Sequence, residues 1–204
     1  MAKAGPRKQA GSGEELRRRL IDATIRVLAA DGFAHASARS IAAEAETVNG
    51  SIFYYFGSMD GLFAATARDL AERGIARIRE GLGGDQAHTE WPSRLGPVMR
   101  AEADGVDGRA VMELFVGART SPALAAEVRT AIDDAIAYAT AEMQAVVGGS
   151  PVAAIVPVAL VAELAAAAFL GIEILLQNGR PVDIDRLSAT LVTAIGVLRS
   201  LGPA

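Results

Sequence analysis

Residues 37–56, SARSIAAEAETVNGSIFYYF, contain two short helical patterns separated by a polar break. Ser37 is placed to cap a first helix over residues 38–45, whose inward face is formed by Ile41, Ala42 and Ala45. The break at residues 46–48 precedes a second short helix that continues to about Phe56. Two short helices joined by a tight turn predict a helix-turn-helix, in which the first helix braces the second.

Longer helical patterns flank this pair. Apolar residues recur at helical spacing over residues 14–31, and Gly32 supplies the C-terminal stop. After the break at Gly57, Ser58 can cap a long helix that continues to about Leu82. Glycines, prolines and polar turns separate five further predicted helices, at 90–103, 108–119, 122–147, 152–178 and 184–201.

The composition favours an all-α fold. Of the 204 residues 51% are apolar, alanine is the most frequent of them, and aromatic residues make up only 5%. We therefore predict three parts. They are a flexible basic arm at 1–13, a three-helix helix-turn-helix DNA-binding domain at 14–60, and a helical effector-binding and dimerisation domain at 61–204.

Charge is distributed unevenly along the chain, although the net charge is −4. Residues 1–19 carry six basic and two acidic side chains, whereas residues 61–204 carry twelve basic and seventeen acidic ones. A basic end on an acidic body indicates that the N-terminal end meets phosphate groups. The alternative for the arm is a solubilising tail.

The sequence argues against catalytic and metal sites. The absence of cysteine excludes disulfides, thiolate zinc sites and cysteine nucleophiles. The two histidines, His35 and His88, lie far apart and have no ligand-spaced carboxylates beside them. The chain also shows no nucleophile elbow, P-loop or dinucleotide-binding glycine motif. We expect neither an enzyme, nor a cofactor, nor a metal site.

One apolar stretch, residues 152–176, has about the length of a membrane span. It contains Pro157, Glu163 and Glu173, and charges at membrane depth are costly. The N-terminus is polar and lacks the apolar core of a secretory signal. We therefore expect a buried helix of a soluble bundle, a cytoplasmic protein and no membrane partner.

The second short helix has the small and polar side chains that a DNA-reading helix needs. A helix fits only the major groove, where Asn49 and Ser51 can face bases and tyrosine hydroxyls can meet phosphates. The candidate DNA contacts are Ser37, Arg39, Asn49, Ser51, Tyr54 and Tyr55. The alternative for each is a solvated surface position. Five neighbouring apolar residues are expected in the core instead: Phe33, Ile41, Ile52, Phe53 and Phe56.

Residues 17–63 closely resemble the DNA-binding domain of the TetR family of regulators. The features that carry the resemblance are Asp31-Gly32-Phe33, Ser37, Ile41-Ala42, Gly50-Ser51-Ile52-Phe53-Tyr54, Phe56 and Leu62. The resemblance covers about a quarter of the chain. It implies an all-α homodimer whose variable C-terminal domain holds a small-molecule pocket and the dimer interface. It also implies binding to a palindromic DNA operator, usually as a repressor released by its ligand.

Four positions depart from the family pattern. Glu46 stands where a turn glycine is usual, Thr47 where valine is common, and Asn49 where the residue is often basic. Met59 replaces a lysine that typically touches a phosphate. Since phosphate contacts contribute to affinity, we expect weaker DNA binding than that of a typical relative. The alternative function is a TetR-like sensor or protein-interaction module with weak or no operator binding.

The C-terminal helices must dimerise and hold an effector if the resemblance holds. The candidate interface combines an apolar stripe with small residues: Leu164, Ala168, Gly171, Leu187, Leu191, Ile195 and Leu198. The alternative is an intramolecular core stripe. Candidate pocket residues are aromatics and methionines that also suit a plain core: Trp91, Met99, Met112, Phe115, Tyr138, Met143 and Phe169. Because few cations lie among them, we expect a largely hydrophobic small-molecule effector.

Overall fold

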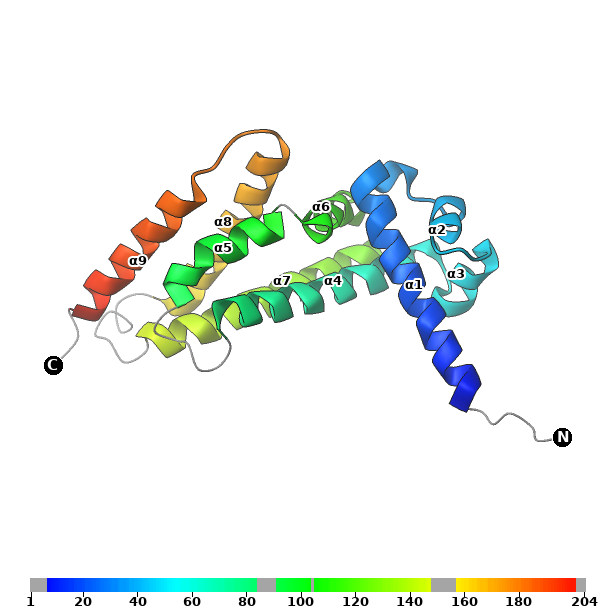
Figure 1. Cartoon of the computed structure of the whole chain (residues 1–204), viewed down its shortest axis with the longest axis horizontal. Coiled ribbons are helices and arrows are strands. Elements are labelled where there is room, and N and C mark those ends of the chain that lie inside the picture. The colour runs from blue at the N-terminus through cyan, green and yellow to red at the C-terminus, as the bar shows by residue number, and fades with distance from the viewer. Residues whose placement is uncertain (1–6, 84–90, 104, 148–156, 201–204) are drawn as a thin grey trace. The chain divides into compact units, whose positions relative to one another are not determined.

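The computed structural model describes residues 7–83, 91–103, 105–147 and 157–200, and this part of the chain is helical (Figure 1). The elements in chain order are α1 Arg7–Asp31, the 3-10 turn η1 Phe33–His35, α2 Ala38–Glu44, α3 Asn49–Phe56, α4 Met59–Leu82, α5 Trp91–Ala103, α6 Val106–Ala118, α7 Pro122–Val147, α8 Val158–Gln177 and α9 Ile184–Ser200. The predicted all-α fold class is confirmed, with a helix-turn-helix near the N-terminus.

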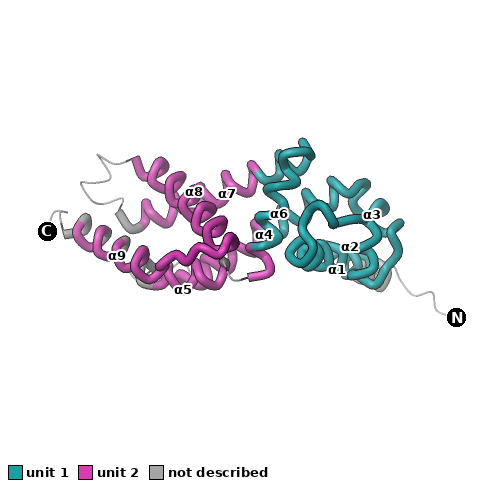
Figure 2. Tube along the Cα trace, turned by 90° about the horizontal axis from the view of Figure 1, so that it is seen from above, with its two compact units in different colours: residues 1–70, 109–128 teal, residues 71–108, 129–204 magenta. Residues whose placement is uncertain are grey.

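The chain divides into two compact units (Figure 2). Unit 1 comprises residues 1–70 and 109–128, and unit 2 comprises residues 71–108 and 129–204. The domain predicted at 14–60 lies within unit 1, but unit 1 also takes in most of α6 and the first turns of α7. A single cut in the sequence at residue 60 therefore does not describe the packing.

One hydrophobic cluster fills unit 1. Its fully buried members come from six helices: Leu20 and Leu28 of α1, Ile41 of α2, Ile52 of α3, Leu62 of α4, Leu114 of α6 and Leu124 of α7. Burial of side chains this large stabilises each by about 1.5–3 kcal/mol relative to exposure. The helix-turn-helix is thus held by α6 and α7 as well as by α1 and α4.

Serine caps define where two of the helices begin. The Ser37 hydroxyl accepts a hydrogen bond from the Ser40 backbone N–H at 3.1 Å, and the Ser40 hydroxyl accepts one from the Ser37 N–H at 2.9 Å. This reciprocal capping box satisfies two N–H groups that α2 itself cannot pair. The Ser58 hydroxyl likewise accepts from the Gly61 N–H at 3.0 Å at the start of α4. Both caps predicted from the sequence are present.

The start of α1 corrects the boundary of the basic arm. Residues 7–13, expected to be flexible, form the first turns of α1, while residues 1–6 lie outside the described part. Two glycines in this segment lower its helix propensity without ending the helix. Gly13 packs under α3, because a β-carbon there would lie 3.4 Å from the Tyr55 hydroxyl oxygen.

The apolar helix α8 is another correction. This helix was expected to be buried. Among its described residues, however, only Ala162 and Glu173 are buried, and the Leu164 side chain is 62% exposed. By length and composition α8 is the one helix in the described ranges that could cross a membrane. The core helices of soluble proteins can have the same length and composition.

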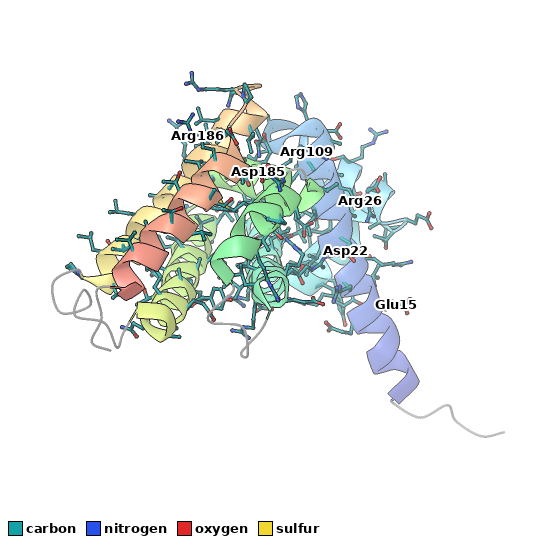
Figure 3. The ribbon with its side chains drawn as sticks, turned by 60° about the vertical axis from the view of Figure 1, so that its left-hand side comes forward. Glu15, Asp22, Arg26, Arg109, Asp185 and Arg186 are labelled. Atoms are coloured by element: carbon teal, nitrogen blue, oxygen red, sulfur yellow. The ribbon has the colours of Figure 1, made fainter. Side chains whose placement is uncertain are left out.

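Unit 2 is held together by helix packing and by ion pairs. Its helix α5 packs against α9 and, over a smaller area, against α8. An ion pair joins Arg100 of α5 to Asp185 of α9, which is labelled in Figure 3. Arg77 of α4 donates two hydrogen bonds of 2.8 Å to Glu102 and one of 2.7 Å to Asp107. These contacts connect α4 with the end of α5 and the start of α6.

Candidate DNA-binding site

The turn between α2 and α3 is a Schellman motif with glutamate at the left-handed position. Glu46 has a φ of 51°, and it is the only non-glycine residue with positive φ in the described ranges. The Thr47 N–H donates to the Ala42 carbonyl at 2.9 Å, and the Glu46 N–H donates to the Ala43 carbonyl at 3.1 Å. Glycine usually occupies this position because it has no β-carbon to strain. The departure noted in the sequence is therefore also a point of backbone strain.

The start of α3 lacks the usual cap. Its N-cap residue is Val48, which offers no side-chain hydrogen bond. The hydroxyls of Thr47 and Ser51, which flank Val48, hydrogen-bond each other at 3.0 Å. Ser51 is thus half-buried and already engaged within the turn, whereas Asn49 and Gly50 are exposed.

One face of α3 packs on unit 1 and the other meets solvent. Ile52 is fully buried, and Tyr55 and Phe56 are half-buried against the core. The opposite face presents Phe53, which is 50% exposed, and Tyr54, which is 82% exposed. Phe53 was expected in the core, and that expectation is wrong. A helix with Ile52 and Phe56 inward, four residues apart, must turn the residue after Ile52 outward.

The two tyrosines of α3 differ in position. Tyr54 is exposed and lies edge-on to Tyr55, with ring centroids 4.9 Å apart. Tyr55 is half-buried, and its hydroxyl lies beside the backbone of Gly13 in α1. The exposed hydroxyl of Tyr54 is therefore the better placed of the two to meet a phosphate group.

Exposed cations lie on the helices that pack around α3. Arg39 is exposed in the first turn of α2, directly after the cap residue Ser37. Arg26 of α1, labelled in Figure 3, donates to Glu44 of α2 at 2.6 Å and so ties these two helices together. Arg17 lies over the ring of Phe56, 5.3 Å from its centroid. Helix α3 itself carries no charged residue.

The candidate pocket residues divide between the two units. Met112 and Phe115 belong to unit 1, and the remaining candidates belong to unit 2: Trp91, Met99, Tyr138, Met143 and Phe169. The side chain of Trp91 lies outside the described residues. Arg79 lies over the Tyr138 ring at 5.4 Å from its centroid. Burial, together with the charge of Glu142, raises the pKa of Tyr138.

Three of the candidate interface residues are exposed in the part of the chain that the structure describes. Leu164 is 62% exposed, Leu187 is 49% exposed and Ala168 is exposed. Gly171 is half-buried, and a β-carbon there would meet nothing within 4 Å. The side chains of Leu191, Ile195 and Leu198 lie outside the described part of α9. The alternative of an intramolecular core stripe does not fit the described leucines.

Comparison with known proteins supports the same family. The sequence model of the bacterial regulatory proteins, tetR family, matches residues 20–66. A member of the TetR family from Streptomyces coelicolor is 27% identical, with a TM-score of 0.62 over 93% of this chain and 99% of that one. A transcriptional regulator from Rhodococcus is 25% identical, with a TM-score of 0.68 over 92% and 98% of the two chains.

A third similar structure holds a ligand. It is the multidrug binding protein EbrR complexed with ethidium, 27% identical, with a TM-score of 0.64 over 93% of this chain and 99% of that one. A search of curated proteins finds no match to the chain. The family model matches residues 20–66, and the similarity to solved regulators extends along nearly the whole chain, so the chain carries a TetR-family DNA-binding domain at its N-terminus and has a TetR-like fold.

Proposed function

We propose that the chain binds a palindromic DNA operator as a homodimer and represses transcription until a small hydrophobic effector releases it. The single observation that supports this most strongly is the position of α3. One face of that helix is anchored by Ile52 on the core of unit 1, and the other presents Asn49 and Tyr54 to solvent. A helix held in this way fits the major groove of duplex DNA. A regulator of this kind acts in the cytoplasm, because bacterial chromosomal DNA lies there.

The exposed face of α8 supports the proposed homodimer. Several large apolar side chains of α8 are 37–62% exposed: Leu160, Val161, Leu164, Ile174 and Leu175. Monomeric soluble proteins rarely expose apolar patches of this kind, whereas an isologous interface would cover the same patch on two copies. One α3 contacts too few bases for specificity, and a two-fold axis would present two of them to successive turns of DNA.

A variant in α8 tests the dimer. Leu164→Glu places a charge on the exposed face of α8. The fold is expected to stay intact, because the exposed Leu164 side chain buries little apolar surface within its own chain. Light scattering after gel filtration should give one chain per particle for the variant and two for the wild type. The matched control is Val116→Glu, an exposed valine of α6, which should remain dimeric. A wild-type monomer would contradict the proposal.

The proposed effector is a largely apolar small molecule bound in unit 2. The half-buried Met99, Tyr138 and Phe169 supply aromatic and flexible apolar surface there. Ethidium, which the similar protein EbrR holds, is a flat aromatic cation, and its rings suit aromatic side chains such as these. Trp91 is the only tryptophan of the chain, so its fluorescence reports binding when DNA is absent. Saturable quenching by ethidium that Tyr138→Ala weakens would support the pocket, and quenching unaffected by the variant would contradict it.

A gel shift with the intergenic DNA beside the chain's own gene tests operator binding. A regulator of its own or neighbouring genes should shift this duplex and resist competition by unrelated DNA. The alternative, a sensor or interaction module, is favoured by Glu46 and Met59, which bring an anion or remove a cation at positions of expected DNA contact. That alternative predicts no shift beyond the one that unrelated DNA gives.

A further inference from the structure

The solvent-facing surface of α3 is uncharged and largely apolar. Three large side chains dominate it: Val48 at 71%, Phe53 at 50% and Tyr54 at 82% exposure. Helix α3 and its N-cap carry no Lys, Arg, Asp or Glu. Exposed cations such as Arg39 lie on neighbouring helices instead. The helix that would enter the groove therefore has no side chain suited to the bidentate Arg–guanine or Lys–guanine contact.

Val48 is unfavourable for the stability of the folded chain. The N-cap position selects Ser, Thr, Asp or Asn, because their side chains pair an N–H group in the first helical turn. Valine cannot do so, and no side-chain cap is formed at Val48. Its side chain is also largely exposed, so burial does not compensate for the missing cap. Nothing in the described part of unit 1 explains a valine at this position.

A partner in the DNA major groove would explain both Val48 and Phe53. The C5-methyl group of thymine is the apolar feature of that groove, and apolar side chains read it by direct contact. Asn49, exposed between them, suits the adenine that pairs with thymine, because an amide can contact adenine N6 and N7 together. A β-carbon at Gly50 or Gly57 would meet nothing within 4 Å, so the backbone on this face is open to close approach.

We propose that α3 reads A·T pairs in the operator half-site by contact of Val48 and Phe53 with thymine methyl groups. The inference rests on the proposed operator binding and specifies its sequence preference. The charged phosphate contacts come from cations outside α3, such as Arg39, and Tyr54 adds only an uncharged hydroxyl, so most of the affinity and the sequence preference reside in different helices.

Deoxyuridine substitution tests the proposal directly, because it removes only the methyl group of thymine. Full-length protein is first used to select duplexes from a randomised library, and each thymine of the selected site is then replaced in turn. Burial of one methyl group predicts about three- to fivefold weaker binding at each contacted thymine. Replacements elsewhere in the site should change affinity less than twofold.

The variant Val48→Ser separates a DNA contact from a structural role. Serine supplies the missing N-cap, so the melting temperature should rise, while one of the thymine-to-deoxyuridine effects should disappear. Phe53→Ala should abolish the deoxyuridine effect at a different thymine. The matched control is Val106→Ser, which changes an exposed valine in the first turn of α6 and should leave every deoxyuridine effect in place.

Three outcomes would overturn the inference, and only the last of them also overturns the proposed function. If the selected duplex binds tightly and deoxyuridine changes nothing at any position, operator binding stands and the methyl readout is wrong. The readout is equally wrong if Val48→Ser and Phe53→Ala both keep the full set of deoxyuridine effects. If selection enriches no sequence at all, the proposed function fails together with the inference.

Discussion

The ring of Phe33 lies directly against the backbone of Gly117. A β-carbon at Gly117 would collide with three carbons of that ring. The Phe33 N–H also donates to the Glu113 carboxylate at 2.7 Å, and the Phe33 ring packs on Phe63 with centroids 4.8 Å apart. The turn after α1 is therefore fixed to α6 by ring packing and by a charge-assisted hydrogen bond, both within unit 1.

Replacement of Gly117 by alanine should destabilise unit 1. The added methyl group overpacks the contact with Phe33, at a cost of about 1–3 kcal/mol, and the better helix propensity of alanine recovers about 1 kcal/mol of that. Urea unfolding should show a net loss of up to about 2 kcal/mol in the free energy of unfolding. The control Gly74→Ala, in open space on α4, should instead gain up to about 1 kcal/mol. Equal effects of the two variants would refute this packing.

Glu46→Gly should stabilise the turn between α2 and α3. Glycine relieves the left-handed strain of about 1–2 kcal/mol but adds about 0.5–1 kcal/mol of unfolded-chain entropy, so a gain of about 0.5 kcal/mol is expected. Ala43→Gly, within α2 at ordinary helical geometry, should lose about 1 kcal/mol in the same unfolding assay. A loss on Glu46→Gly would show that the glutamate side chain has a stabilising contact.

Met59→Lys should tighten DNA binding. Met59 begins α4, at the position where the family resemblance places a phosphate-contacting lysine. One added phosphate contact should steepen the dependence of log K on log salt by about 0.9 and lower Kd several-fold at low salt. A fluorescence titration with the selected duplex measures both quantities, and Met59→Gln serves as the uncharged control. If the lysine variant binds no more tightly than the glutamine variant, Met59 does not face a phosphate.

The Arg77 cluster should matter more for stability than the exposed pair in the same unit. Its partners Glu102 and Asp107 are only 13% and 26% exposed, and their carboxylates raise the pKa of Arg77. Arg77→Met leaves both carboxylates without this cation, at a cost of about 1–2 kcal/mol, since Arg77 is itself partly exposed. Arg100→Met removes an exposed pair and should cost less than about 1 kcal/mol in urea unfolding. A larger loss of unfolding free energy for Arg100→Met than for Arg77→Met would contradict this ranking of the two ion-pair sites.

Helix positions were predictable from the sequence because the signals that set them are local. Ser37 and Ser58 form the expected caps, and the helix ends at Gly32 and Gly57 lie where the glycines predicted them. The start of α1 was placed seven residues too late, because the glycines at 11 and 13 suggested a flexible arm. Helix propensity is a weak guide near a terminus, where a neighbour such as Tyr55 can stabilise an extra turn.

Non-local packing set the limits of the prediction. Phe53 was assigned to the core on its apolarity, although the inward spacing of Ile52 and Phe56 turns it outward. The contribution of α6 and α7 to unit 1 had no signal in the sequence, since the contact between Phe33 and Gly117 spans more than eighty residues. For α8 the composition left two expectations open, burial within one chain and burial between two, and the exposure of Leu164 does not fit the first of them.

Footprinting on the selected operator tests most directly whether α3 is presented to DNA twice per dimer. Hydroxyl-radical cleavage of the bound duplex should show two symmetric protected half-sites whose centres lie about 34 Å, or one helical turn, apart. Tyr54→Ala should weaken both half-sites equally, because the exposed hydroxyl is expected to meet phosphate in each. A single protected patch, or protection that Asn49→Ala and Tyr54→Ala leave unchanged, would contradict the account.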